Sequence, residues 1–234
     1  MRIVLVGYGR MGRLVGELAG GYGGEVVGVI DPVSPSHTGA ADDDRWRGFA
    51  DVAIDFSLGD AVVSNVPALA RRGLNVVLGT TGWQQHEAVL RRAVADAGTG
   101  IVAAPNFATG VVIFEALVRF AARRFAGQSE FGAWLHEAHH STKKDAPSGT
   151  ALLLKRAMEA AGYERAIDVS STRAGSIPGT HTVGFDGPSD SITLTHTARD
   201  RGAFARGALV AARWVQGKRG WFDMQDVLGL RGAS

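Results

Sequence analysis

The stretch that most constrains the fold runs from Gly7 to Gly12, directly after the apolar run RIVLV at residues 2–6. A strand that leads into a G-x-G-x-x-G loop and then a helix is typical of a dinucleotide-binding unit. The first glycine allows the tight turn, the second lets the backbone approach a pyrophosphate, and the third lets the helix pack on the strand. A second apolar run, 25–30, ends at Asp31, where an acid can accept hydrogen bonds from an adenosine ribose.

Short apolar segments continue to alternate with helical ones up to residue 107, which predicts a parallel, doubly wound sheet. The expected strands are 2–6, 25–30, 52–57, 75–78 and 101–104, and the expected helices are 13–18, 59–72 and 84–97. The polar segment 32–48 is expected to be a loop. In such sheets ligands bind beyond the carboxyl ends of the strands, so the turns 79–82 and 104–107 are expected to flank the nicotinamide half of a cofactor.

The pattern changes after residue 107 to a helix, a strand, a helix and then a run of strands, which is typical of an α+β unit. We expect helices at 109–125, 149–161 and 202–215, strands at 131–139, 167–173, 181–185 and 191–196, and a tail, 221–228, that packs back on the first domain. The predicted fold class is α/β: a Rossmann-like doubly wound parallel sheet, plus a second α+β substrate and oligomerisation domain with a mixed sheet. The predicted domains are 1–107 with 214–234, and 108–213.

Chemistry-bearing side chains gather between Glu137 and Leu154, EAHHSTKKDAPSGTALLL. Two adjacent histidines and two adjacent lysines precede a Pro-Ser-Gly-Thr turn, and a helix that follows this turn would point free backbone N–H groups at an anion. The candidate proton donors are His139, His140 and Lys143. The stretch therefore predicts an active site for a negatively charged substrate.

Composition excludes several classes of protein. The 234 residues contain no cysteine, which removes thiolate nucleophiles, disulfides and Cys-type zinc sites. The net charge of +2 comes from scattered arginines, so no nucleic-acid partner is expected. There is no 18-residue apolar run and no signal-peptide pattern, so we expect a cytoplasmic protein without a membrane partner. Lysine is scarce, and two of the four lysines stand beside the paired histidines.

Hydride transfer is the leading reaction class, and two alternatives remain open. A metal hydrolase could use Glu137, His139, His140 and Asp145, but adjacent histidines on an extended chain point to opposite faces, and no metal is expected. A catalytically silent protein that senses nicotinamide nucleotides is the second alternative. His181 and His196 lie in predicted strands and are expected to be structural.

Residues 137–151, EAHHSTKKDAPSGTA, resemble the signature E-x-H-H-x-x-K-x-D-A-P-S-G-T-A of the 4-hydroxy-tetrahydrodipicolinate reductase family, which serves lysine biosynthesis by the diaminopimelate route. Similar segments follow in the family's order over essentially the whole chain: VGYGRMG at the start, DFS at 55–57, GTTG at 79–82, PNF at 105–107, R-x-G-x-I-x-G-x-H at 173–181, FARGA at 204–208 and DMQDVLGL at 223–230. The resemblance implies reduction of the dehydrated heterocycle to tetrahydrodipicolinate with NADPH or NADH, in a homotetramer assembled through the substrate domain.

The resemblance also implies roles for single positions. His139 matches the catalytic acid/base and Lys143 the proton-donating lysine, whereas Lys144 falls on a variable position. The contacts to the substrate, a small cyclic dicarboxylate, are His140, Gly149 and Thr150. Glu137 and Asp145 become supports that orient the loop. The cofactor contacts are Gly7, Tyr8, Gly9, Arg10, Met11, Gly12, Asp31, Gly79, Thr80, Thr81, Ala104, Pro105, Asn106 and Phe107.

The chain departs from the family where the nucleotide's 2′-phosphate would bind. Asp31 is followed by Pro32, whereas some members carry a basic residue there. Arg10 could substitute for it, so we expect use of both nucleotides with a leaning to NADH. The segment 32–49 is also short for the family and is expected to be a trimmed surface loop.

Overall fold

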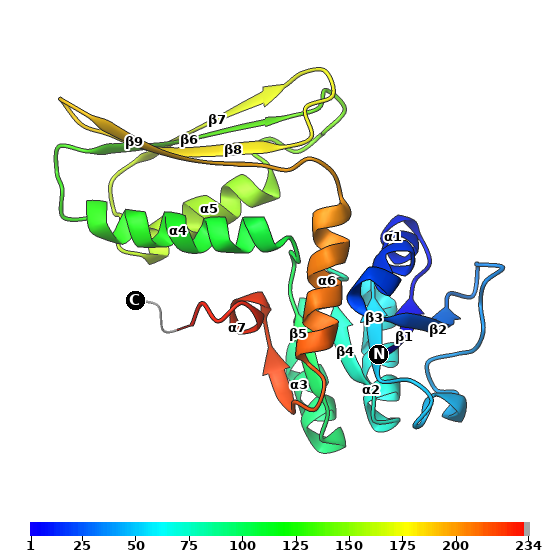
Figure 1. Cartoon of the computed structure of the whole chain (residues 1–234). Coiled ribbons are helices and arrows are strands. Elements are labelled where there is room, and N and C mark those ends of the chain that lie inside the picture. Colours follow the sequence, from blue (N-terminus) through cyan, green and yellow to red (C-terminus); the bar gives the residue numbers. More distant parts are fainter. Residues whose placement is uncertain (232–234) are drawn as a thin grey trace. The chain divides into compact units, whose positions relative to one another are not determined.

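The computed structural model describes residues 1–231, which form two compact units (Figure 1). Among the described residues, unit 1 comprises Met1–Thr109 and residues 202–231, and unit 2 comprises Gly110–Arg201. Residues 232–234, the end of the predicted segment 214–234, lie outside the described residues. Within residues 1–231, no helix combines the length and the apolar character needed to cross a membrane.

Unit 1 is built on a six-stranded sheet in the order β10-β5-β4-β3-β1-β2, and every neighbouring pair is parallel. Its strands are β1 (Arg2–Val6), β2 (Glu25–Ile30), β3 (Val52–Asp55), β4 (Asn75–Leu78), β5 (Gly100–Ala103) and β10 (Gly220–Phe222). The central strand β3 is buried at all four positions, as expected for a parallel sheet covered on both faces. The doubly wound parallel sheet predicted from the sequence is confirmed.

The helices of unit 1 follow the strands as the periodicity predicts. They are α1 (Arg10–Ala19), α2 (Gly59–Arg71), α3 (Glu87–Ala97), α6 (Gly202–Trp214) and α7 (Met224–Val227), with short 3₁₀ turns at Gly20–Tyr22, Asp44–Trp46 and Gln84–His86. Helix α1 begins three residues before the predicted start at residue 13, so the end of the glycine loop forms its first turn. The turn at Asp44–Trp46 interrupts the predicted loop 32–48 because the Trp46 ring is buried in the core beneath β2.

The second domain boundary differs from the prediction. Residues 202–213 were expected in the substrate domain, but α6 belongs to unit 1, where it contacts α1, β3 and β4. At Gly207 the helix lies so close to the Phe107 carbonyl that an added Cβ would be 1.7 Å from its oxygen. The prediction failed because the small residues of α6 are buried on most of its circumference, so their pattern does not indicate which unit they face.

Unit 2 packs helices against one face of a four-stranded mixed sheet in the order β7-β6-β8-β9 (Figure 1). Its strands are β6 (Gly132–His139), β7 (Ile167–Arg173), β8 (Thr180–Asp186) and β9 (Ser191–Thr197), and its helices are α4 (Thr109–Phe125) and α5 (Gly149–Ala160). Strands β6 and β7 are parallel, whereas β8 pairs antiparallel with both β6 and β9. The core between sheet and helices includes Leu135, Leu154 and Phe185. This is the predicted α+β unit with a mixed sheet.

Candidate active site

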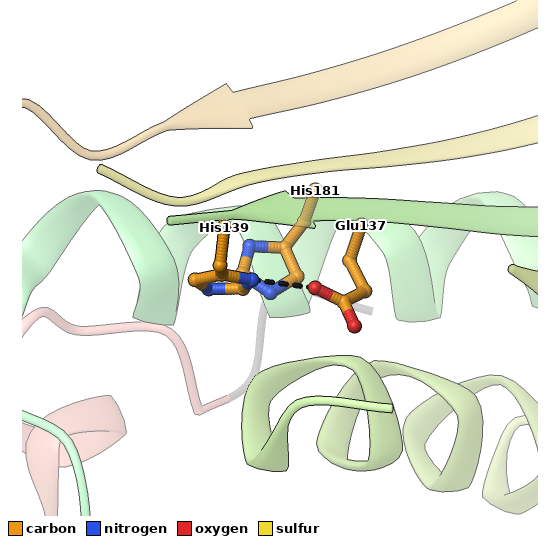
Figure 2. Close-up of side chains that lie close together, drawn as sticks. All are labelled: Glu137, His139 and His181. Carbon is orange, nitrogen blue, oxygen red and sulfur yellow. Dashed lines mark hydrogen bonds and ion pairs between the residues drawn. The ribbon is translucent and has the colours of Figure 1, made fainter. Parts of the chain in front are cut away.

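Strand β6 presents its reactive side chains to the helix layer of unit 2. Because side chains alternate along a strand, Ala133, Leu135, Glu137 and His139 share one face, and the first three are buried. Figure 2 shows Glu137 and His139 projecting to the same side of the sheet as His181. His181 lies directly opposite Glu137 on the neighbouring strand β8. The register of the sheet therefore brings two imidazoles and one carboxylate together.

The Glu137 carboxylate is completely buried and saturated with donors. Both guanidinium nitrogens of Arg173 bind it, at 2.9 Å and 2.7 Å, and the backbone N–H of Ser148 reaches it at 3.2 Å. The His139 Nδ1 lies 2.5 Å from its Oε2 (Figure 2). Burial alone would raise the pKa of Glu137, but the hydrogen bonds from Arg173, Ser171, His139 and Ser148 outweigh it and lower the pKa to about 2. Glu137 is therefore an anion at neutral pH.

This anion determines how the His139 ring is oriented. An ionised carboxylate can only accept hydrogen bonds, so the His139 Nδ1 carries the proton between the two groups. The remaining ring nitrogen, Nε2, faces Gly179, where a Cβ would lie 3.1 Å from it and where the backbone φ is +131°. The His139 side chain is 12% exposed. Its Nε2 is thus the ring nitrogen available to a substrate.

His181, which the sequence analysis assigned a structural role, lies within this group. Its Nε2 is 2.9 Å from the Ser148 hydroxyl, and its ring meets the His139 ring edge-on with centroids 5.1 Å apart. Burial and the neighbouring His139 lower the pKa of His181 to about 4. His181 is therefore neutral at physiological pH and links β8 to the start of α5.

The lowered pKa of His181 predicts a loss of stability in mild acid. The folded-state pKa of about 4 lies below the ordinary value of 6.5, so the unfolded chain binds more protons between these values and stability falls as pH drops through that window. When the pH falls from 7 to 5, His181 should lower the free energy of unfolding by roughly 2 kcal/mol. Urea unfolding at both pH values should show a larger decrease in the free energy of unfolding for the wild type than for His181→Asn. Equal decreases in the two proteins would contradict the lowered pKa of His181.

The loop after β6 carries the other predicted substrate residues. The Lys143 ammonium binds both carboxylate oxygens of Asp145, at 2.8 Å and 3.0 Å, and the Lys143 backbone N–H bonds to the His140 carbonyl. The His140 Nδ1 lies 2.7 Å from the Thr142 hydroxyl. The Lys143 charge is also one of the smaller causes of the lowered pKa of His181. Asp145 therefore forms an ion pair with the lysine within this loop.

Helix α5 begins where the anion site was predicted. Ser148 is its N-cap, with its hydroxyl accepting the Ala151 N–H at 3.1 Å, and Gly149 and Thr150 are the first helical residues. The first N–H groups of a helix lack intrahelical partners and favour an anion. Because Glu137 and His181 both bind Ser148, this helix start is fixed beside the His139 ring.

Glu137, His139 and His181 also have the side-chain types of a metal site. One ligand atom from each of Glu137, His139 and His181 lies within 4.8 Å of the others. The Arg173 guanidinium, however, occupies both Glu137 oxygens and places a positive charge where a cation would bind. The His139 Nδ1 is likewise used as a donor. These contacts fit a proton-transfer group better than a metal centre.

In unit 1 the glycine loop has the geometry that a nucleotide requires. Gly7 has φ +82°, and Gly12 lies so close to it that a Cβ on Gly12 would be 2.1 Å from the Gly7 carbonyl oxygen. Gly9, the N-cap of α1, faces open space, where a pyrophosphate can approach the helix start. The Asp31 carboxylate accepts the Tyr8 N–H at 2.7 Å and lines a cavity of about 470 Å³ with Gly7 and Gly9. The loop, the acid and the cavity fit a dinucleotide.

The remaining predicted cofactor turns follow β4 and β5 at the same edge of the sheet. The Thr80 hydroxyl is turned inward to Asp55, and the Phe107 ring is 1% exposed and packs edge-on against Phe56. These two residues can therefore offer a ligand only their backbone groups. Thr80, Ala104 and Pro105 line a second cavity of about 610 Å³.

Models of known protein families match both the N-terminal and the C-terminal part of the chain. The family model for the N-terminus of dihydrodipicolinate reductase matches residues 1–107, and the model for its C-terminus matches residues 110–228. The chain belongs to the dihydrodipicolinate reductase family. The 4-hydroxy-tetrahydrodipicolinate reductase of Christiangramia forsetii is 35% identical over 97% of this chain and 98% of that protein. The enzyme of the same name from Rhodopseudomonas palustris is 36% identical over 100% and 98%.

Among solved structures, dipicolinate-bound dihydrodipicolinate reductase from Paenisporosarcina sp. TG-14 matches with a TM-score of 0.82. It is 21% identical, and the match covers 97% of this chain and 98% of that one, which shows the shared fold. A myo-inositol dehydrogenase from Corynebacterium glutamicum is similar at a TM-score of 0.55. The fold of this family member is thus also used by other dehydrogenases.

Proposed function

We propose that the chain is a nicotinamide-nucleotide-dependent reductase of the heterocycle formed from 4-hydroxy-tetrahydrodipicolinate, producing tetrahydrodipicolinate for lysine biosynthesis. The observation that carries this proposal is the buried pair of Glu137 and His139 beside the start of α5, within the segment that matches the family. This arrangement places a proton donor next to an anion-binding turn. Reduction of an unsaturated dicarboxylate needs both.

The chain's own residues supply the proton and the orientation of the substrate. The bound nucleotide supplies a hydride, and the electron density that the hydride adds to the ring must be neutralised by a proton. We assign that proton to the Nε2–H of doubly protonated His139, whose Nδ1–H stays bonded to Glu137, so that the transfer leaves the neutral Nδ1–H ring. Lys143 assists as a second cation that Asp145 holds in the same loop. The net change adds one hydride and one proton across a double bond.

The substrate's carboxylates are assigned to the loop and the helix start. Gly149 and Thr150 offer the first N–H groups of α5 and one hydroxyl, and His140 lies at the end of β6 beside Thr142. A planar ring with two carboxylates, such as dipicolinate, should bind here as an inhibitor. This is the small dicarboxylate named for the similar solved structure.

The nucleotide is assigned to the carboxyl edge of the unit 1 sheet. The glycine loop, Asp31 and the turns after β4 and β5 support this assignment. We further propose a homotetramer assembled through unit 2, and a cytoplasmic location, on the basis of the family resemblance. Sedimentation at micromolar concentration tests the tetramer.

Steady-state kinetics with enzymatically generated substrate test the function. Purified protein should oxidise NADH or NADPH only when the heterocycle is present, and dipicolinate should inhibit. Nucleotide binding without substrate-dependent oxidation would instead favour a nucleotide sensor. Full activity after treatment with a chelator is the expected result, and loss of activity that zinc restores would favour a metal hydrolase.

The same assay tests the choice of nucleotide, which we expect to favour NADH. Within the described residues, no lysine or arginine lines the cavity beside Asp31, and Arg10 lines an adjoining hollow that shares Gly9 with it. A 2′-phosphate in the cavity would therefore meet the Asp31 carboxylate without a lysine or arginine among the lining residues, which should give kcat/KM at least ~10-fold higher with NADH than with NADPH. Asp31→Ser should narrow that ratio. Selective loss of NADPH use in Arg10→Ala would show that Arg10 binds the phosphate and would contradict this prediction.

A further inference from the structure

Glu137 accepts hydrogen bonds from several separate segments of unit 2. His139 reaches it from its own strand β6, Arg173 from β7, and Ser148 from the N-cap of α5. Its exposure is zero, so no water-facing side of the carboxylate remains. A buried carboxylate is costly unless every oxygen is paired, and here each oxygen has at least two donors.

We propose that Glu137, oriented by its bidentate contact with Arg173, is a positioning residue. It couples the proton donor His139 to the carboxylate-binding turn at the start of α5. This inference rests on the function proposed above. One Glu137 oxygen, Oε2, holds the His139 Nδ1, and the other, Oε1, holds the Ser148 backbone N–H. A displacement of this carboxylate would therefore move both the His139 ring and the start of α5.

The contact with Arg173 explains why an uncharged residue cannot replace Glu137. The guanidinium binds both oxygens, and its Nη2 also bonds to the Asp145 carbonyl at 2.5 Å in the loop that carries Lys143. A glutamine has one acceptor and one donor group at these positions. In either orientation its NH₂ group would face one Arg173 nitrogen, together with either the His139 Nδ1–H or the Ser148 N–H. Two of the four contacts must then break.

The orientation of the His139 ring decides which of its nitrogens faces Gly179. A Cβ on Gly179 would lie 3.1 Å from the His139 Nε2, so a side chain at this position would crowd the ring, and glycine leaves room for it. Because the Nδ1 proton stays with Glu137, the proton that His139 takes up and gives away is the one on Nε2. If the ring flips, or if the neutral ring carries its proton on Nε2 instead, Nε2 can no longer take up a proton at this place. Glu137 thus determines which nitrogen exchanges the proton.

Glu137→Gln tests the proposal, with Glu115→Gln as the matched control. Glu115 is a partly buried glutamate of unit 2 that pairs with Arg119 at 2.7 Å, and both residues lie on α4. We expect Glu137→Gln to lower kcat by about 10²-fold, within the range for loss of a well-oriented proton donor, and to weaken dipicolinate binding measured by calorimetry. The Kd for NADH should stay unchanged, because the glycine loop belongs to unit 1. Glu115→Gln should match the wild type in all three measurements.

Histidine ring ¹⁵N chemical shifts give a test that does not depend on turnover. In spectra of the neutral ring, wild-type His139 should carry its proton on Nδ1. In Glu137→Gln the Nδ1–H tautomer should no longer be the more populated one. Arg173→Lys, which keeps the charge but not the two-pronged contact, should show a smaller change of the same kind.

Two outcomes overturn the inference. One is an unchanged His139 tautomer in Glu137→Gln, and the other is a fall in kcat that leaves dipicolinate affinity at the wild-type value, which would remove the coupling. If the wild type itself fails to reduce the heterocycle, the proposed function fails, while the tautomer measurement still tests the role of Glu137.

Discussion

Replacing His139 by glutamine is expected to lower kcat for reduction of the heterocycle by about 10²–10⁴-fold, the usual contribution of a general acid. The side chain keeps its approximate size but can no longer present a protonated ring nitrogen beside Gly179. The Kd for NADH, measured by fluorescence titration, should not change, since His139 lies in unit 2 and the glycine loop in unit 1. Equal losses in kcat and kcat/KM for the heterocycle identify an interaction that is made only in the transition state.

His86→Gln is the matched control for this variant. His86 ends the short turn before α3 in unit 1, where its ring contacts the side chain of Gln85. It should retain wild-type kcat. Lys143→Ala should lower kcat in the same direction as His139→Gln, because it removes the second cation of the loop. Near wild-type kcat in both His139→Gln and Lys143→Ala would show that the site is wrongly assigned.

The fold could be predicted largely because its signals are local. The glycine loop, the alternation of apolar strands and helices, and the change to consecutive strands after residue 107 each depend on residues close in sequence. The segment with His139, His140 and Lys143 was likewise visible, because its chemistry-bearing residues are adjacent. In α6, by contrast, small residues face several directions, so the pattern could not decide which unit the helix joins.

The partners of His139 could not be assigned from the sequence. Arg173 and His181 lie on separate strands, and their contacts depend on the sheet register, in which His139 pairs with Arg173 and Glu137 with His181. Arg173 and His181 were both part of the motif that resembles the family, but a strand histidine is more often structural. The available signal was the shared face of Glu137 and His139, two residues apart on one strand.

Gly12→Ala is expected to weaken NADH binding by about 10²-fold, because the nucleotide loop cannot accept a methyl group at this position. The new Cβ would lie 2.1 Å from the Gly7 carbonyl oxygen, so the start of α1 must move away from the loop by more than an ångström. The pyrophosphate would then lose charge-assisted hydrogen bonds to N–H groups at the helix start, each worth about 1.5–3 kcal/mol, and about 2.7 kcal/mol corresponds to 10²-fold in Kd. The added crowding should also lower the unfolding free energy by about 1–3 kcal/mol.

Gly20→Ala separates this steric effect from a general intolerance of alanine in the helix. Gly20 follows the last residue of α1, has φ −56°, and has no atom within 4 Å of the position of a Cβ. It should bind NADH like the wild type and be at least as stable, since alanine restricts the unfolded chain at a position whose conformation it can adopt. Fluorescence titration gives the affinities, and thermal unfolding of each apo protein shows whether Gly12→Ala is folded. A folded Gly12→Ala protein with wild-type affinity would mean that the nucleotide does not use this loop, because the clash would then have been absorbed without affecting its site.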